Sequence, residues 1–231
     1  DSSEYPSLPE LSPEQQFTIP ADLLKSIIRE TVFAVATSES RPVLTGVNWN
    51  IQGDELICVA TDSHRLARRK VKLEQLPSEV NSVVIPGKSL NELNKILEDS
   101  TNPVQIVMTS QQVLFKTEDV LFFSRLLEGN YPDTSRLIPS EYKTNVTIEG
   151  KSLLQAIDRA SLLAREDRYN VVRFETLEGN VVEISSNSPE IGKVEEQISV
   201  SAFDGEALKI SFSAKYMMEA LKAIDGQEVV I

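Results

Sequence analysis

The chain has 231 residues, of which 41% are hydrophobic and 25% charged, a composition typical of globular proteins rather than of disordered, collagenous or membrane-spanning ones. At about 150 residues per domain, this length allows between one and two domains. The net charge of −12 argues against a surface that binds nucleic acid all over, and the single cysteine and single histidine exclude an intramolecular disulfide and a multi-histidine metal site.

The first segment, residues 1–16, is acidic and contains three prolines. A secretory signal begins with basic residues and continues with apolar ones, and no apolar run in the chain approaches the roughly 20 residues that cross a bilayer. We therefore expect a cytoplasmic protein with no membrane partner. The stretch from Tyr5 to Pro9 resembles residues 131–139, which close a later repeat, so residues 1–16 are expected to be the tail of a preceding unit.

One pattern, a short strand-like run followed by an amphipathic helix, recurs four times. The copies begin with residues 17–24, 83–90, 146–153 and 210–217. Their matched positions are separated by 66, 63 and 64 residues and are occupied by Ile19, Ile85, Ile148 and Phe212. Spacing this regular indicates an internal structural repeat.

Three alternating, strand-like segments follow each of the first three helices. We expect strands at 43–51, 55–61, 64–73, 104–108, 113–117, 120–127, 171–176, 181–185 and 193–200. The repeat is therefore β-α-β-β-β, which predicts an α+β fold with helices on one face of antiparallel sheets. If two repeats make a domain, residues 17–140 form a complete domain and residues 141–231 a truncated one.

Basic residues recur on the predicted outer faces of the helices. On a helical wheel, Lys88 and Lys95 lie opposite Leu90 and Leu93. The fourth copy repeats this arrangement, and the complete set is Lys25, Arg29, Lys88, Lys95, Lys151, Arg159, Lys215 and Lys222. An acidic protein can present a basic face when its charges are segregated in this way. The alternative is that these side chains are simply solvated.

Three further motifs have competing interpretations. The Gly-Lys-Ser triplets at 87–89 and 150–152 lack the earlier glycine of a phosphate-binding loop, so we interpret them as helix starts. The polar segment 60–66 could suggest hydrolysis at Asp62 and His64, but neighbours in a tight turn rarely face one another, so a ligand-contacting turn is favoured. Leu162 falls among polar residues on its wheel, beside Leu163, which indicates a contact surface.

The strings ATDSHRLA, VVIPGKSLNELNKIL, LLEGNYPDTSRLIP and FSAKYMMEALKAI closely resemble the bacterial DNA polymerase III beta subunit family of replicative sliding clamps. The resemblance runs along the whole chain and implies a DNA-clamp fold, with 17–140 as the family's second domain and 141–231 as most of its third. It implies a non-enzymatic processivity factor, without cofactor or metal, that acts in DNA replication. Two protomers would form a homodimeric ring around duplex DNA, with sequence-independent contacts from the outward cations.

The resemblance also implies a peptide-binding pocket between the second and third domains. Short linear motifs containing glutamine, leucine and phenylalanine would bind there and link the clamp to the DNA polymerase III alpha subunit, the clamp loader and repair proteins. The matching residues are Arg41, Leu44, Thr61, Ser63, His64, Arg65, Leu66, Pro132, Arg136, Leu137, Ser213 and Tyr216. Ser63 stands where the family often has glycine.

Leu162 and Leu163 match the family's dimer-contact leucines. Because the matching first domain and final strands are not in this sequence, we expect an incomplete pocket and no closed ring from the chain alone. The competing hypothesis is a repeat-built protein-interaction module without a DNA role.

Overall fold

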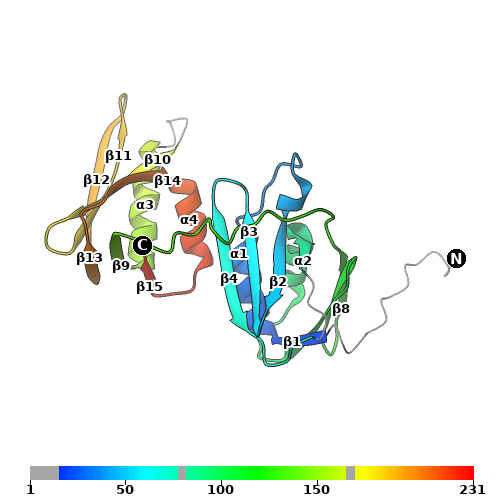
Figure 1. The fold of residues 1–231 in the computed structure, drawn as a ribbon. Helices are drawn as coiled ribbons and strands as arrows, with labels where there is room; N and C mark the ends of the chain where they lie inside the picture. Colours follow the sequence, from blue (N-terminus) through cyan, green and yellow to red (C-terminus); the bar gives the residue numbers. More distant parts are fainter. Residues whose placement is uncertain (1–15, 78–81, 165–169) are drawn as a thin grey trace, which may run out of the picture. The chain divides into compact units, whose positions relative to one another are not determined.

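The computed structural model describes residues 16–77, 82–164 and 170–231, and its contacts divide the chain into two compact units after Pro132 (Figure 1). We call residues 16–132 the first unit and residues 133–231 the second unit. The predicted tail of a preceding unit, except for residue 16, lies outside the described residues. Within these described ranges, no helix is long and apolar enough to cross a bilayer.

The first unit contains two successive β-α-β-β-β repeats. The elements of the first repeat are β1 (Gln16–Pro20), α1 (Ala21–Val32), a short 3-10 helix (Pro42–Thr45), β2 (Gly46–Gln52), β3 (Glu55–Thr61) and β4 (Leu66–Lys72). Those of the second repeat are β5 (Val83–Pro86), α2 (Gly87–Ile96), β6 (Pro103–Met108), β7 (Gln112–Lys116) and β8 (Leu121–Arg125).

The second unit begins another pair of repeats. Its elements are β9 (Thr144–Glu149), α3 (Gly150–Ala164), β10 (Val171–Leu177), β11 (Val181–Ser188), β12 (Gly192–Ser199), β13 (Ala202–Gly205), β14 (Lys209–Ser213), α4 (Ala214–Ala223) and β15 (Glu228–Val230). The four-residue strand β13 differs from the predicted pattern. It pairs with β9 after a short turn, extending the third repeat beyond its expected three strands.

All strand pairs are antiparallel, and the leading strand of each repeat joins the sheet of its neighbour. In the first unit the sheets have the orders β1-β6-β7-β8 and β4-β3-β2-β5. In the second unit, β14 pairs with β10, and β9 pairs with β13 and β15. The predicted α+β fold with antiparallel sheets is confirmed. The exchange of leading strands explains why two repeats close one unit.

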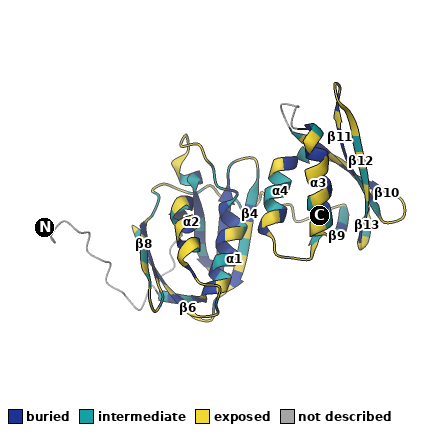
Figure 2. Cartoon of the chain, turned by 180° about the vertical axis from the view of Figure 1, so that it is seen from behind, coloured by how far each residue is buried: buried dark blue, intermediate teal, exposed yellow. Residues whose placement is uncertain are grey.

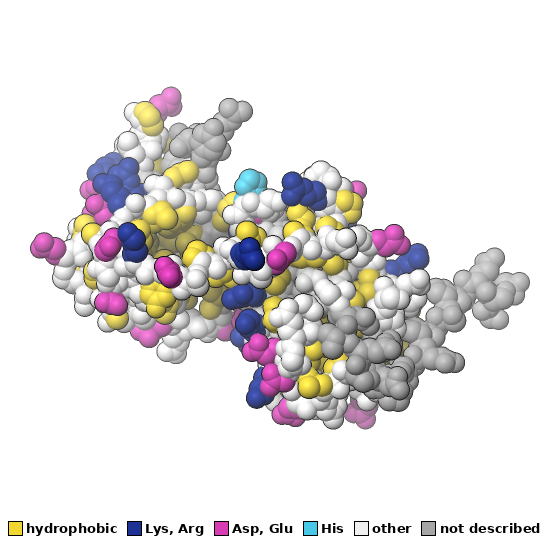
Figure 3. Space-filling view, in the orientation of Figure 1, with side chains coloured by type: hydrophobic (Ala, Val, Ile, Leu, Met, Phe, Trp, Pro, Cys, Tyr) yellow, Lys and Arg dark blue, Asp and Glu magenta, His cyan; other side chains and the backbone are white. Residues whose placement is uncertain are grey.

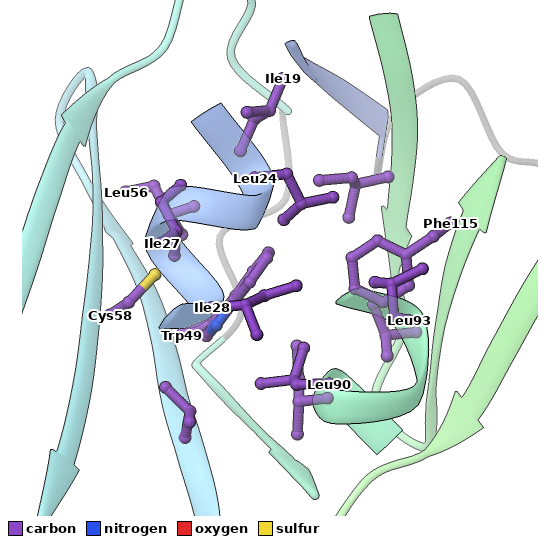
Figure 4. Close-up of a cluster of buried hydrophobic side chains, with 14 of the residues drawn as sticks. Ile19, Leu24, Ile27, Ile28, Trp49, Leu56, Cys58, Leu90, Leu93 and Phe115 are labelled. Atoms are coloured by element: carbon purple, nitrogen blue, oxygen red, sulfur yellow. The ribbon is translucent and has the colours of Figure 1, made fainter. Parts of the chain in front are cut away.

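Each unit has its own hydrophobic core. In the first unit, Leu24 and Ile27 of α1 and Leu90 of α2 are fully buried against the sheets, as Figure 4 shows. Trp49 meets Phe115 edge to face, with ring centroids 5.9 Å apart. In the second unit, the core is formed by residues such as Leu153, Ile157, Phe174 and Ile184. The helices pack with their apolar faces inward and leave exposed stripes on the opposite side (Figure 2).

The one cysteine lies within the first of these cores. Cys58 is fully buried, and desolvation raises the pKa of its thiol well above the usual value despite the nearby positive charge of Arg69. A thiol held neutral in this way is a poor nucleophile and metal ligand. Across the described ranges, no group of three or more His, Cys, Asp and Glu side chains could hold a metal ion.

Candidate functional site

The turn between β3 and β4 is organised by the carboxylate of Asp62. Its Oδ1 accepts hydrogen bonds from the backbone N–H groups of His64 (2.9 Å) and Arg65 (3.0 Å), and its Oδ2 lies 3.1 Å from Nε of Arg65. Partial burial acts to raise the pKa of Asp62, but the two N–H donors and the guanidinium outweigh it and lower the pKa. An aspartate that caps its own turn in this way fixes the backbone direction of the following residues.

Thr61 closes the same turn from its other side. Its hydroxyl donates to the carbonyl of Arg65 (2.6 Å) and accepts from the backbone N–H of Ser63 (3.2 Å). Ser63 itself has a φ of 77°, in the left-handed region that favours glycine. A glycine at this position would adopt the same conformation without the steric cost of a Cβ atom.

Two neighbouring segments contact this turn. Arg41 donates from Nη1 to the hydroxyl of Ser63 (3.4 Å), and the guanidinium of Arg65 lies over the ring of Phe33 with 5.5 Å to its centroid. From the chain after β8, the hydroxyl of Tyr131 accepts a hydrogen bond from the backbone N–H of Thr61 (3.0 Å). The structure thus brings the segment after α1 and the segment after β8 together at this turn.

The other predicted pocket residues of the first unit are placed around this network. Leu44 is 3% exposed on the 3-10 helix, and Leu66 is half-buried at the start of β4. His64 and Pro132 are exposed. Figure 3 shows the chain's single histidine in cyan at the surface. The combination offers a small apolar surface edged by cationic and hydrogen-bonding groups.

Four predicted pocket residues belong to the second unit. Arg136 and Leu137 are exposed in a turn where the N–H of Leu137 donates to the carbonyl of Thr134 (3.1 Å). Ser213 caps α4, because its hydroxyl accepts from the backbone N–H of Tyr216 (3.3 Å). Tyr216 is half-buried on the first turn of that helix. The role of these residues in binding a peptide remains a prediction.

Most of the predicted DNA-facing cations lie on exposed positions of the four helices. In the first unit, α1 packs beside α2, and in the second unit α3 packs beside α4. The exposed set consists of Arg29, Lys88, Lys95, Lys151, Arg159, Lys215 and Lys222. Lys95 forms an ion pair with Glu92, one turn earlier on the same helix (2.7 Å). In solvent such a pair contributes little, so the ammonium of Lys95 can exchange partners.

Two of the predicted cations have structural partners from other elements. Lys25 is half-buried, and its Nζ donates to the carbonyl of Leu97 (3.1 Å) and pairs with Asp99 (2.9 Å). Arg159 forms a two-point contact with Glu196 of β12, with Nε and Oε2 2.8 Å apart. The hydrogen bonds from Arg159 lower the pKa of Glu196 despite some desolvation. Both cations therefore join elements of their unit in addition to any role toward DNA.

Leu162 and Leu163 lie in the last turn of α3. Leu162 is 58% exposed, whereas Leu163 is half-buried. The exposure of Leu162 agrees with its place on the helical wheel, and the contact with a second protomer stays a prediction.

Sequence reasoning did not name Tyr131 or Phe33 as parts of the pocket network, and it named Asp62 only as a member of the polar turn 60–66. The signal for Tyr131 was present, since it precedes the predicted pocket residue Pro132 and the same dipeptide occurs at residues 5–6. No sequence pattern indicates the contact between the ring of Phe33 and Arg65, because the two residues are brought together only by folding.

Two family descriptions match almost the entire chain. Residues 18–133 match the central domain of the DNA polymerase III beta subunit, and residues 135–231 match its C-terminal domain. The chain belongs to the DNA polymerase III beta subunit family. It is 58% identical over 229 residues to the beta sliding clamp of Bacillus subtilis (strain 168), covering 99% of this chain and 61% of the relative. It is 54% identical to the Staphylococcus aureus beta sliding clamp, covering 100% of this chain and 61% of that one.

Solved beta subunit structures show the same fold. The crystal structure of the Bacillus subtilis DNA polymerase sliding clamp superposes with a TM-score of 0.92 at 58% identity, covering 100% of this chain and 60% of that one. A sliding clamp of Pseudomonas aeruginosa bound to griselimycin gives a TM-score of 0.88 at 28% identity, covering 99% and 61% of the two chains. The chain thus has the DNA-clamp fold and spans about three fifths of the length of these beta subunits.

Proposed function

We propose that the chain supplies the second domain and most of the third domain of a replicative sliding clamp, with residues 17–140 and 141–231 as these domains. In this role the protein is a cytoplasmic, non-enzymatic processivity factor. As a homodimeric ring it encircles duplex DNA and tethers the replicative polymerase. The names of the relatives support this proposal, and so does the arrangement of cations on the helices.

The observation that carries the proposal is that basic residues occupy equivalent exposed positions in successive repeats. Lys88 and Lys95 on α2 correspond to Lys215 and Lys222 on α4, each pair being seven residues apart. Lys151 starts α3 at the position that Lys88 has on α2. Mobile ammonium groups on such faces interact with phosphates over several ångströms without reading base sequence, which permits sliding.

Charge reversal of the four repeated lysines tests this proposal. In the full-length protein, Lys88→Glu, Lys95→Glu, Lys215→Glu and Lys222→Glu together are expected to reduce loading and retention on circular DNA at least tenfold. The four substitutions remove up to four contacts with phosphates and add four negative charges that repel the DNA. Retention would be measured by gel filtration of clamp loaded onto nicked circular DNA.

A matched variant separates position from net charge. Lys70→Glu, Lys72→Glu, Lys116→Glu and Lys209→Glu make the same charge change on strands β4, β7 and β14, where the side chains are exposed. This control is expected to retain DNA like the wild type. If the helix variant is retained equally well, the DNA role is wrong and the protein-interaction module without a DNA role is favoured.

We further propose that the turn between β3 and β4 belongs to the site for short linear motifs of the polymerase alpha subunit, the clamp loader and repair proteins. Half-buried Leu66 and exposed Pro132 provide apolar surface for leucine and phenylalanine side chains, whereas Leu44 is buried. The guanidinium of Arg41 provides hydrogen-bond donors for the peptide main chain. The solved sliding clamp of Pseudomonas aeruginosa that is bound to griselimycin supports the presence of a ligand-binding site in this family.

A further inference from the structure

The backbone N–H of the last residue of β3 donates to a side chain from outside its sheet. The β2–β3 ladder runs as far as the pair Asn48 and Val59, so Thr61 lies beyond its last partner in β2. The hydroxyl of Tyr131 takes the place of a strand carbonyl and accepts from the N–H of Thr61 at 3.0 Å. Thr61 is 7% exposed and Tyr131 is half-buried, so this bond is partly shielded from water.

From this geometry we infer that Tyr131 is a positioning residue for the peptide-binding turn, acting through Thr61. The inference rests on the proposed function of that turn. It adds to that proposal a residue outside the predicted pocket set that holds the turn in its binding conformation before a peptide binds.

The connection from Tyr131 to the turn is short and continuous. The same Thr61 whose N–H is held by Tyr131 uses its hydroxyl to bond the carbonyl of Arg65 and the N–H of Ser63. A displacement of Thr61 therefore moves both ends of the segment that carries Ser63, His64 and Arg65. Three proposed ligand-contacting residues depend on this one anchor.

The tyrosine is itself firmly attached on its own side. The N–H of Leu127 donates to the carbonyl of Val84 (2.9 Å), which ties the chain after β8 to β5. Only three residues lie between Leu127 and Tyr131, and one of them, Gly129, has a φ of 116° that turns the chain. Pro132, a proposed pocket residue, follows directly. Tyr131 thus fixes the position of Pro132 relative to the turn.

Burial also keeps the hydroxyl neutral. Desolvation raises the pKa of Tyr131 to about 12, even though the bond from the N–H of Thr61 acts in the opposite direction. At physiological pH the anchor is a neutral hydroxyl, so its effect on the turn should not vary between pH 6 and 9.

Tyr131→Phe removes the acceptor while keeping the ring. We expect the variant to bind an N-acetylated, fluorescein-labelled Gln-Leu-Ala-Leu-Phe peptide about fivefold more weakly, because a looser turn is less often in its binding conformation. The measurement is fluorescence anisotropy with the full-length protein. The matched control is Tyr142→Phe, since Tyr142 is 74% exposed, and its affinity should equal that of the wild type.

Amide hydrogen exchange distinguishes positioning from general stability. The N–H of Thr61 should exchange at least fivefold faster in Tyr131→Phe, whereas amides of the strand interior such as Cys58 should keep their protection. Equal acceleration at both sites would mean a structural role and would overturn the inference. A wild-type peptide affinity in Tyr131→Phe would overturn it as well.

A second variant keeps the test decisive if the tyrosine variant folds poorly. Thr61→Val removes the hydroxyl that carries the connection into the turn while conserving side-chain shape. Its peptide affinity should also fall about fivefold, and the double variant should be weaker by less than the product of the two single effects. If the affinity losses of the two single variants multiply fully in the double variant, Tyr131 and Thr61 act independently, which would contradict the inference. If the wild type itself does not bind the peptide, the proposed peptide-binding role fails, a result distinct from equal binding by wild type and variant.

Discussion

Ser63 has a left-handed backbone conformation in the proposed binding turn, with a φ of 77°. For a residue with a Cβ atom, this conformation costs about 1 kcal/mol relative to glycine. We therefore expect Ser63→Gly to increase the free energy of unfolding by up to about 1 kcal/mol, offset in part by the greater chain entropy of glycine in the unfolded state. Urea denaturation would measure the change.

The control is Ser63→Ala, which keeps the Cβ atom but removes the hydroxyl that accepts from Arg41 at 3.4 Å. It should leave stability unchanged or slightly lower, because that bond is long and exposed. If alanine stabilises the chain as much as glycine does, backbone strain at Ser63 is not the cause.

Asp62 makes the stability of the same turn dependent on pH. Its pKa is lowered from the usual 3.8 in the folded state, so the folded chain binds its proton less readily than the unfolded chain. This stabilisation is complete above the usual carboxyl pKa and is lost as pH falls through the lowered value. Asp62→Asn keeps an Oδ1 acceptor but no charge, and should be about 1 kcal/mol less stable than the wild type at pH 7.

The gap between Asp62→Asn and the wild type should narrow as pH falls below the usual carboxyl pKa, and it should close only when pH lies below the lowered pKa of the folded state. Urea denaturation of both chains over a series of pH values from neutral into the acid range would measure it. A gap that stays constant over this range would assign the effect to side-chain geometry and not to the charge.

At the scale of the element, helical periodicity correctly predicted which side chains of α2 are buried, except in its last turn. Leu90 and Leu93 of α2 were predicted to face inward and are 1% exposed. The same helical wheel also places Ile96 on the apolar side of α2, but Ile96 is 45% exposed. The reason is that α2 ends at Ile96, and the extended backbone of Leu97 turns that side chain into the core. A wheel assumes a constant rotation per residue, which fails in the last turn.

Contacts between elements could not be predicted from the helices alone. The wheel placed Arg159 on an outward face, but its partner Glu196 is 37 residues away on β12. Lys25 likewise reaches the carbonyl of Leu97, 72 residues away. The turn at 60–66 was predicted as a ligand contact from its polar residues, whereas its anchor Tyr131 is 70 residues from Thr61. The local sequence pattern identified these cations and this turn, but the residues that they contact are set by the tertiary fold.

At the scale of the whole molecule, the exchanged leading strands make each pair of repeats a cooperative unit. The core of the first unit contains Trp49 and Phe115 from different repeats, and its members among the described residues all come from that unit. The core of the second unit similarly joins Ile157 and Ala214 from different repeats. Two separate cores in one chain imply two unfolding events that can be perturbed independently.

The single tryptophan allows these two events to be separated, because Trp49 reports only on the first unit. Leu93→Ala should destabilise the first unit by about 2–5 kcal/mol and lower the midpoint of urea unfolding followed by tryptophan fluorescence. Ile157→Ala, a truncation of a fully buried side chain in the second unit, should leave that midpoint unchanged. It should instead shift the transition seen by far-ultraviolet circular dichroism to lower urea. If Ile157→Ala moves the fluorescence midpoint as far as the dichroism midpoint, the two units unfold as one, and the stability of the proposed binding turn would then depend on both.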